Sequence, residues 1–229
     1  FSQEVCRYAL RVGARFIQAS SAATYGDGAH GFSDDPTLAF RLRPLNMYGY
    51  SKHLFDLWAI REKLIGRIAS LKFFNVYGPN EYHKGPMRSV VVKAFEEIKA
   101  RGRISLFKSR RGDYADGEQR RDFVYVKDCA ELVAWLVDNP DRNGLFNVGT
   151  GRSASFNELA RAVFAALKIP EVIDYVDMPE ELAEKYQYFT EADMGAMQAT
   201  GYPVAAMRDI TAGVADYVHN YLSQSDMHL

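Results

Sequence analysis

The chain has 229 residues, of which 48% are hydrophobic and 25% charged, so it can bury a substantial core as an ordinary globular protein. Its formal net charge of −1 gives no general attraction to nucleic acids or anionic membranes, and we expect neither as a partner. No apolar run approaches the roughly 18 residues of a membrane span. The two cysteines and five histidines lack disulfide or metal-ligand spacing, which favours a reducing, cytoplasmic compartment and predicts no metal site.

Helical and strand patterns alternate through the first part of the chain. Apolar residues at helical spacing predict a helix over Ser2–Val12, and a short buried strand is expected at Arg15–Ala19. A polar, glycine-rich loop precedes a long helix over Asn46–Leu64, and the next strand is expected at Ile68–Phe74. The apolar side of the long helix is expected to contain Leu54, Phe55, Trp58 and Leu64.

The second part of the chain continues this alternation. Ser155 and Glu158 have the spacing of a capping box at a helix start. Strands alternating with helices predict an α/β fold with a largely parallel sheet. Helices are expected at Ser89–Arg101, Asp128–Val137, Ser155–Leu167 and around Met207–Tyr221, and strands at Ile104–Phe107, Asp122–Val126, Leu145–Val148 and Val172–Val176.

Tyr48 and Lys52 lie four residues apart at the start of the long helix. This spacing places the phenol and the ammonium on one helix face. A free phenol is a poor base at neutral pH, and a nearby cation favours the phenolate. Such a group can take a proton from an alcohol while hydride leaves the same carbon. Alone, the spacing is weak evidence, because ordinary helix packing also produces it.

A serine-rich segment, residues 19–26 (ASSAATYG), lies just past a strand end. Open α/β sheets bind their ligands at this edge. The Ser21 hydroxyl could therefore hydrogen-bond a reacting oxygen and orient it toward Tyr48. The alternative is a turn in which the serine only satisfies backbone groups.

Two further blocks, residues 75–79 (NVYGP) and 146–151 (FNVGTG), follow Ser21 and the Tyr48/Lys52 pair in order over most of the chain. Together the four blocks resemble the extended short-chain dehydrogenase/reductase family of epimerases and dehydratases. The resemblance implies the C-terminal part of a doubly wound, Rossmann-like parallel sheet with a smaller α/β substrate-binding lobe.

Within that family, five segments look like the ADP-heptose 6-epimerase pattern: 25–26 (YG), 44–52 (PLNMYGYSK), 73–85 (FFNVYGPNEYHKG), 121–126 (RDFVYV) and 186–190 (YQYFT). The most specific piece is HKG at 83–85. The resemblance implies epimerisation of ADP-D-glycero-D-manno-heptose to ADP-L-glycero-D-manno-heptose at C6″, by transient oxidation and reduction, for lipopolysaccharide core synthesis. It also implies a homo-oligomer, with a pentamer as the expected size.

The resemblance implies that Ser21, Tyr48 and Lys84 are catalytic. An epimerase removes hydride from one face of a carbon and returns it to the other, so the carbonyl oxygen meets two proton donors in turn. Tyr48 and Lys84 would be these donors. From the residues alone, Lys84 could equally neutralise the substrate's diphosphate or cap a loop.

Other roles follow from the same resemblance. Lys52 and Val76 would lie at the cofactor. From the residues alone, Lys93 could be a solvated helix residue, Phe107 a core residue, and Arg121 the partner of a surface carboxylate at Asp122 or Glu118. The residues implied in substrate binding are Asn75, Lys93, Phe107, Arg121 and Tyr186.

The implied cofactor is NADP, with NAD as the other possibility. Residues 1–85 would be the remainder of a dinucleotide-binding domain and 86–229 mainly a substrate lobe, with 122–150 returning to the Rossmann-like core. The chain departs from the family in lacking the glycine-rich dinucleotide fingerprint, which relatives carry in a preceding N-terminal portion. Phe1 begins inside an expected helix, which indicates a fragment or a processed chain. Pro86 also stands where relatives often carry a small hydroxyl residue.

Two rival interpretations remain open. One is another nucleotide-sugar enzyme of this family, such as a UDP-hexose 4-epimerase or a dehydratase. The other belongs to a different class: an inactive, truncated chain that only binds sugar nucleotide.

Overall fold

The computed structural model describes residues 1–183 and 186–224, and the chain divides into two compact units. Unit 1 comprises Phe1–Phe74, Cys129–Gly151 and Glu191–Ala206. Unit 2 comprises Asn75–Asp128, Arg152–Thr190 and Met207–Leu229. No helix in the described residues is long and apolar enough to cross a membrane.

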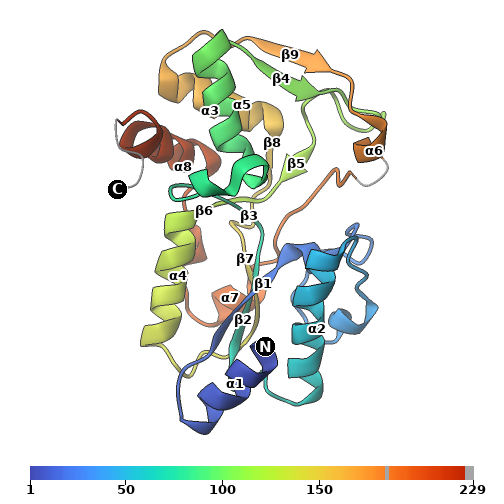
Figure 1. Cartoon of the computed structure of the whole chain (residues 1–229), viewed down its shortest axis with the longest axis vertical. Helices are drawn as coiled ribbons and strands as arrows, with labels where there is room; N and C mark the ends of the chain where they lie inside the picture. The colour runs from blue at the N-terminus through green and yellow to red at the C-terminus, as the bar shows by residue number, and fades with distance from the viewer. Residues whose placement is uncertain (184–185, 225–229) are drawn as a thin grey trace. The chain divides into compact units, whose positions relative to one another are not determined.

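Unit 1 is built on a three-stranded parallel sheet in the order β1 (Ile17–Ser21), β2 (Ala69–Phe73), β7 (Gly144–Val148) (Figure 1). In register, Ser21 pairs with Phe73 and Phe73 with Val148, so the three carboxyl ends are level. The parallel sheet confirms the predicted fold class. The first strand was predicted two residues too early, since its pairing with β2 begins at Ile17 and continues to Ser21. The Arg15 guanidinium donates instead to the carbonyls of Pro140 and Arg142 in the loop before β7.

Two long helices share one apolar cluster in unit 1. α1 (Ser2–Arg11) contributes Cys6, and α2 (Met47–Arg61) contributes Phe55 and Ala59. The prediction that Leu54 lies on the apolar side of α2 is wrong, since 60% of its surface is exposed. The helix instead buries His53 and Asp56 beside Phe55, so polar contacts help to set its orientation. The shorter elements of unit 1 are η1 (Ala22–Tyr25), η2 (Leu38–Arg41), α7 (Gly195–Ala199) and η4 (Val204–Ala206).

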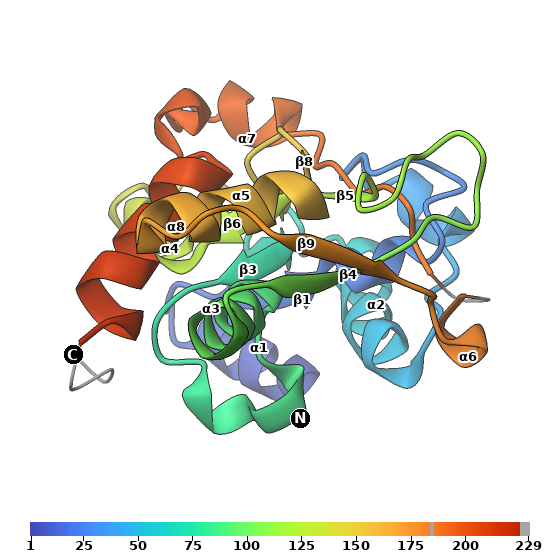
Figure 2. The ribbon, with the colours of Figure 1, turned by 90° about the horizontal axis from the view of Figure 1, so that it is seen from above.

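Unit 2 combines three strand pairs with several helices around one hydrophobic core. β3 (Asn75–Tyr77) pairs in parallel with β6 (Phe123–Tyr125), β4 (Ile104–Phe107) pairs in parallel with β9 (Ile173–Val176), and β5 (Arg120–Arg121) pairs antiparallel with β8 (Ala154–Ser155). β4 runs beside β9 and contacts α3 and α5 (Figure 2). The helical elements are η3 (Tyr82–Met87), α3 (Val90–Arg101), α5 (Phe156–Leu167), α6 (Glu180–Ala183), α8 (Ile210–Tyr217) and a π-helical extension, η5 (Val218–Leu222). α4 (Val126–Asp138) begins in unit 2 and continues in unit 1.

Asn147 on β7 is the centre of a buried hydrogen-bond network in unit 1. Its Oδ1 accepts from the Tyr25 hydroxyl (2.7 Å), and its Nδ2 donates to the carbonyls of Phe32 (2.7 Å) and Asp193 (2.9 Å). Its backbone N–H donates to Asp34 Oδ2 (2.7 Å). Burial raises the pKa of the Asp34 carboxyl to about 6, despite that hydrogen bond.

Asp34→Asn should change how the stability of the protein depends on pH. The Asp34 pKa is raised from 3.8 to about 6 in the folded state, so the native protein binds more protons than the unfolded chain between these values. Wild-type stability should therefore fall by at most about 3 kcal/mol relative to the variant as pH rises through this window. The amide keeps an acceptor for the Asn147 N–H but does not titrate. Urea unfolding at pH 4 and 7, with exposed Asp138→Asn as control, measures this difference; a pH-independent difference would contradict it.

Gly49 lets the first turn of α2 approach η1. A Cβ at this position would lie 2.7 Å from the Ala23 carbonyl oxygen and 2.9 Å from Pro44 Cβ, closer than real contacts allow. The Asn46 side chain accepts from the Gly49 N–H (2.8 Å) and begins the helix there. The glycine is thus required by packing, although alanine is the better helix former.

Gly49→Ala should destabilise the protein by about 1–3 kcal/mol, because the added methyl group must push α2 away from η1. In an unconstrained helix the same change would stabilise by about 1 kcal/mol. Gly66→Ala is the matched control, since its Cβ would meet nothing within 4 Å. Urea denaturation of both variants measures the contrast, and equal stabilities would refute the packing explanation.

Candidate functional site

The Tyr48 and Lys52 side chains lie together at the start of α2, as predicted. The Lys52 Nζ is 5.8 Å from the centroid of the Tyr48 ring and donates to the Ala19 carbonyl on β1 (2.9 Å). Tyr48 is 57% exposed, so its phenol is accessible to a ligand. The ammonium has three donors, and one bond to Ala19 leaves capacity for a further oxygen.

Ser21 ends β1 and caps η1. Its Oγ accepts from the Ala23 N–H (3.1 Å), which is the turn expected as the alternative to a catalytic role. Accepting this bond uses a lone pair and not the hydroxyl proton, which is the donor that a reacting oxygen would need. The Ser21 carbonyl accepts from the Thr24 hydroxyl (2.8 Å), so the turn is held from both sides. The capping role and the catalytic role are therefore compatible.

Lys84 lies in unit 2, exposed on η3, whereas Tyr48 and Ser21 belong to unit 1. The buried Glu81 carboxylate contacts the chain on both sides of η3. It accepts from the Gly78 N–H (3.3 Å), from the Ser89 hydroxyl (2.7 Å) and N–H, and from the Tyr217 hydroxyl (3.2 Å). Sequence reasoning missed Glu81, which lies in the quoted motif but has no chemical signature of an anchor.

A cavity of about 210 Å³ in unit 2 brings together two of the predicted substrate residues, Phe107 and Tyr186. The Arg121 guanidinium lies 5.1 Å from the centroid of the Tyr186 ring and 5.8 Å from that of Phe156. Arg121 Nη1 donates to the Arg120 carbonyl (2.8 Å), and burial lowers the Arg121 pKa. The residues that line the cavity are Val90, Ser105, Leu106, Phe107, Gln119, Phe156 and Tyr186.

Gln119 and Phe156 contribute to this cavity but were not predicted. Gln119 Nε2 donates to the Phe107 carbonyl (3.3 Å), and the Phe156 N–H donates to the Gln119 carbonyl (3.2 Å). The β5–β8 pairing brings these distant segments together, and no local spacing in the sequence signals it.

The remaining predicted residues lie outside this cavity. Lys93 is exposed on α3, and its ammonium donates to the Pro86 carbonyl (2.7 Å), so it braces η3. Asn75 and Val76 are exposed on β3, and the Asn75 N–H donates to the Asp122 carbonyl (3.0 Å). A ligand role for these three residues stays a prediction.

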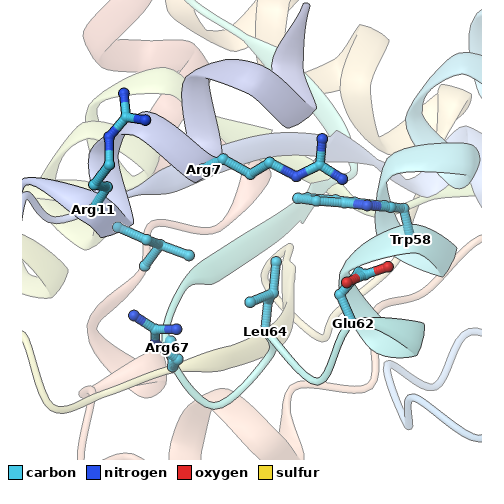
Figure 3. Close-up of a pocket in the computed structure, with 7 residues that line it drawn as sticks. Arg7, Arg11, Trp58, Glu62, Leu64 and Arg67 are labelled. Atoms are coloured by element: carbon cyan, nitrogen blue, oxygen red, sulfur yellow. The ribbon is translucent and has the colours of Figure 1, made fainter.

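A separate cavity in unit 1, of about 280 Å³, contains none of the predicted site residues. Arg7, Arg11 and Arg67 surround it together with Trp58, Glu62 and Leu64 (Figure 3). The Arg7 guanidinium lies 5.3 Å from the Trp58 ring centroid and also pairs with Glu4. Arg7 is thus already engaged by its own helix and by α2.

Comparison with known proteins identifies the relatives of the chain. Residues 1–149 match the model of the NAD dependent epimerase/dehydratase family. The chain is 58% identical over its full length to an ADP-L-glycero-D-manno-heptose-6-epimerase of Nitratidesulfovibrio vulgaris, covering 71% of that protein. It is 45% identical to the enzyme of that name from Fusobacterium nucleatum, with 94% of the chain and 67% of the relative covered.

Solved structures agree with these matches. The ADP-L-glycero-D-manno-heptose-6-epimerase of Helicobacter pylori matches with a TM-score of 0.72 and 26% identity over 94% of the chain and 62% of that protein. The chain thus spans less than two thirds of this solved relative. A UDP-glucose 4-epimerase of Thermus thermophilus in complex with NAD shares the fold at a TM-score of 0.69 and 24% identity. The predicted family is confirmed: the chain belongs to the NAD-dependent epimerase/dehydratase family, and its similar curated relatives are ADP-L-glycero-D-manno-heptose-6-epimerases.

Proposed function

We propose that the protein converts ADP-D-glycero-D-manno-heptose to ADP-L-glycero-D-manno-heptose by inverting C6″. The observation that carries this proposal is the Tyr48/Lys52 pair beside the end of β1, in a chain 58% identical to an enzyme of that name. The same arrangement supports an active protein over a chain that only binds sugar nucleotide.

Tyr48 is the proposed acid/base for the C6″ hydroxyl. Its exposed phenol can reach a ligand, and the Lys52 ammonium lies 5.8 Å from the centroid of its ring. The Ser21 hydroxyl would donate to the same substrate oxygen and hold it toward Tyr48. Proton removal at a positioned oxygen typically contributes 10²–10⁴-fold in rate.

A nicotinamide dinucleotide is the cofactor that family membership implies, and NADP in particular is our proposal. When bound, it would take the hydride from C6″ and return it to the opposite face. The donor set at the end of β1 fits such a group, because Lys52 keeps ammonium donors beyond its bond to Ala19 and can hold ribose oxygens. Val76, exposed on β3, offers an apolar surface for a nicotinamide ring.

The cavity at Phe107 and Tyr186 is the proposed nucleotide site. Aromatic side chains there offer flat surfaces for a base, and Arg121 offers a forked set of donors to phosphate oxygens. Lys84, and Asn75 with Lys93, would contact the rest of the sugar nucleotide. We further propose that the protein acts in the cytoplasm as a homo-oligomer, as the resemblance implies.

Tyr48→Phe should lower kcat for ADP-heptose epimerisation by about 10²–10⁴-fold, because the variant lacks the exchangeable proton. Its KM should change little, since the ring remains. NMR of the C6″ proton, with the full-length protein and bound NADP, follows both epimers. An unchanged kcat would remove Tyr48 from the chemistry, and conversion of UDP-glucose in preference to ADP-heptose would favour the 4-epimerase alternative.

Lys84→Gln separates the two roles open to Lys84. As the second acid/base it should lower kcat by about 10²-fold or more with little change in KM. As a neutraliser of the diphosphate it would raise KM and leave kcat nearly intact. Arg101→Gln removes an exposed cation from the same unit and is the charge control. If KM changes and kcat does not, Lys84 is not the second acid/base.

A further inference from the structure

A buried lysine lies at the middle of the unit 1 sheet. Lys72 on β2 has 1% of its side chain exposed, and its Nζ lies 3.4 Å from Asp56 Oδ2 on α2, which is fully buried. The same Nζ donates to Thr24 Oγ1 (2.6 Å) and lies 4.6 Å from the centroid of the Tyr25 ring. Burying a charge pair gains little stability over apolar residues of similar size. The pair therefore calls for another explanation.

Asp56 ties α2 to two strands. Its Oδ2 accepts from the Ser20 hydroxyl on β1 (2.6 Å), and its Oδ1 accepts from the Ser70 hydroxyl on β2 (2.7 Å). Tyr48, Lys52 and Asp56 follow one another at intervals of four residues, so they share one face of α2. Lys52 donates a further hydrogen bond to the Ala19 carbonyl on β1. This face of α2 is thereby fixed against the end of β1.

Lys72 reaches the Ser21 turn through Thr24. The Thr24 hydroxyl accepts from Lys72 Nζ and donates to the Ser21 carbonyl (2.8 Å). A hydroxyl that donates and accepts at once has a defined rotamer, so it transmits the position of the lysine to the turn. One ion pair therefore holds both the element that carries Tyr48 and the turn that carries Ser21.

We propose that Lys72 and Asp56 are positioning residues that fix the Ser21 hydroxyl relative to the Tyr48 phenol. The inference rests on the proposed function, because it assigns the pair a role in that reaction. Neither residue needs to touch the substrate. A displacement of about 1 Å between reacting groups can cost about 10²-fold in rate, so a rigid connection below the surface matters to kcat.

The test compares charge removal with conservative replacement. Lys72→Met/Asp56→Asn removes both charges and leaves no unpaired ion, so we expect it to fold with a Tm close to the wild type. Its kcat should fall about 10–100-fold, while KM for ADP-heptose stays within about twofold, since the proposed nucleotide site lies in unit 2. Lys72→Arg keeps the cation and should retain most of the activity. Asn143→Ala breaks a polar contact before β7 and should leave kcat unchanged.

Hydrogen exchange adds a readout that does not depend on activity. In the double variant, exchange should increase at residues 21–25 and 47–52 and stay unchanged elsewhere in unit 1. Unchanged kcat, or a loss of kcat with faster exchange throughout unit 1, would overturn the inference.

If the double variant does not fold, Thr24→Val tests the inference instead. We expect its kcat to fall about tenfold, and an unchanged kcat would contradict the positioning role. If the wild type is inactive on ADP-heptose, the proposed function fails, and exchange at the two segments alone decides on positioning.

Discussion

The Lys72–Asp56 ion pair constrains how unit 1 can assemble. Each ion loses its hydration on burial, so each needs close polar partners. Lys72 has Asp56, Thr24 and the face of Tyr25, and Asp56 has the hydroxyls of Ser20 and Ser70. A shift of α2 by one turn would leave both charges unpaired, at a cost of several kcal/mol. The pair thus selects one arrangement of α2 on β1 and β2, even where it adds little net stability.

This constraint extends into the loops through Tyr25. The Tyr25 ring lies beside Lys72, and its hydroxyl donates to Asn147 on β7. Asn147 in turn holds the Phe32 and Asp193 carbonyls, which belong to loops distant in sequence. Charged and polar contacts therefore connect all three strands with the segments around their carboxyl ends. Apolar packing alone is non-directional and would not fix these loops to this degree.

Local interactions explain what the sequence could predict. The Ser155/Glu158 spacing predicted a capping box, and both of its hydrogen bonds form. The strand at Ile104–Phe107 was also placed correctly, as was the proximity of Tyr48 and Lys52. The prediction for Leu54 failed for a tertiary reason. The contacts of the buried Asp56 with the sheet orient α2 so that Leu54 faces solvent.

Long-range pairing explains what sequence reasoning missed. Lys72 was only one residue of the strand predicted at Ile68–Phe74, since nothing nearby in sequence reveals its contacts with Asp56 and Thr24. The cavity in unit 2 was missed for the same reason, because the long-range β5–β8 pairing joins Gln119 to Phe156. The Arg121 guanidinium lies 5.1 Å from the centroid of the Tyr186 ring and 5.8 Å from that of Phe156, two aromatic contacts from segments far apart in sequence. Arg121 is buried, which lowers its pKa, so a phosphate at the proposed nucleotide site would meet a poorly hydrated cation.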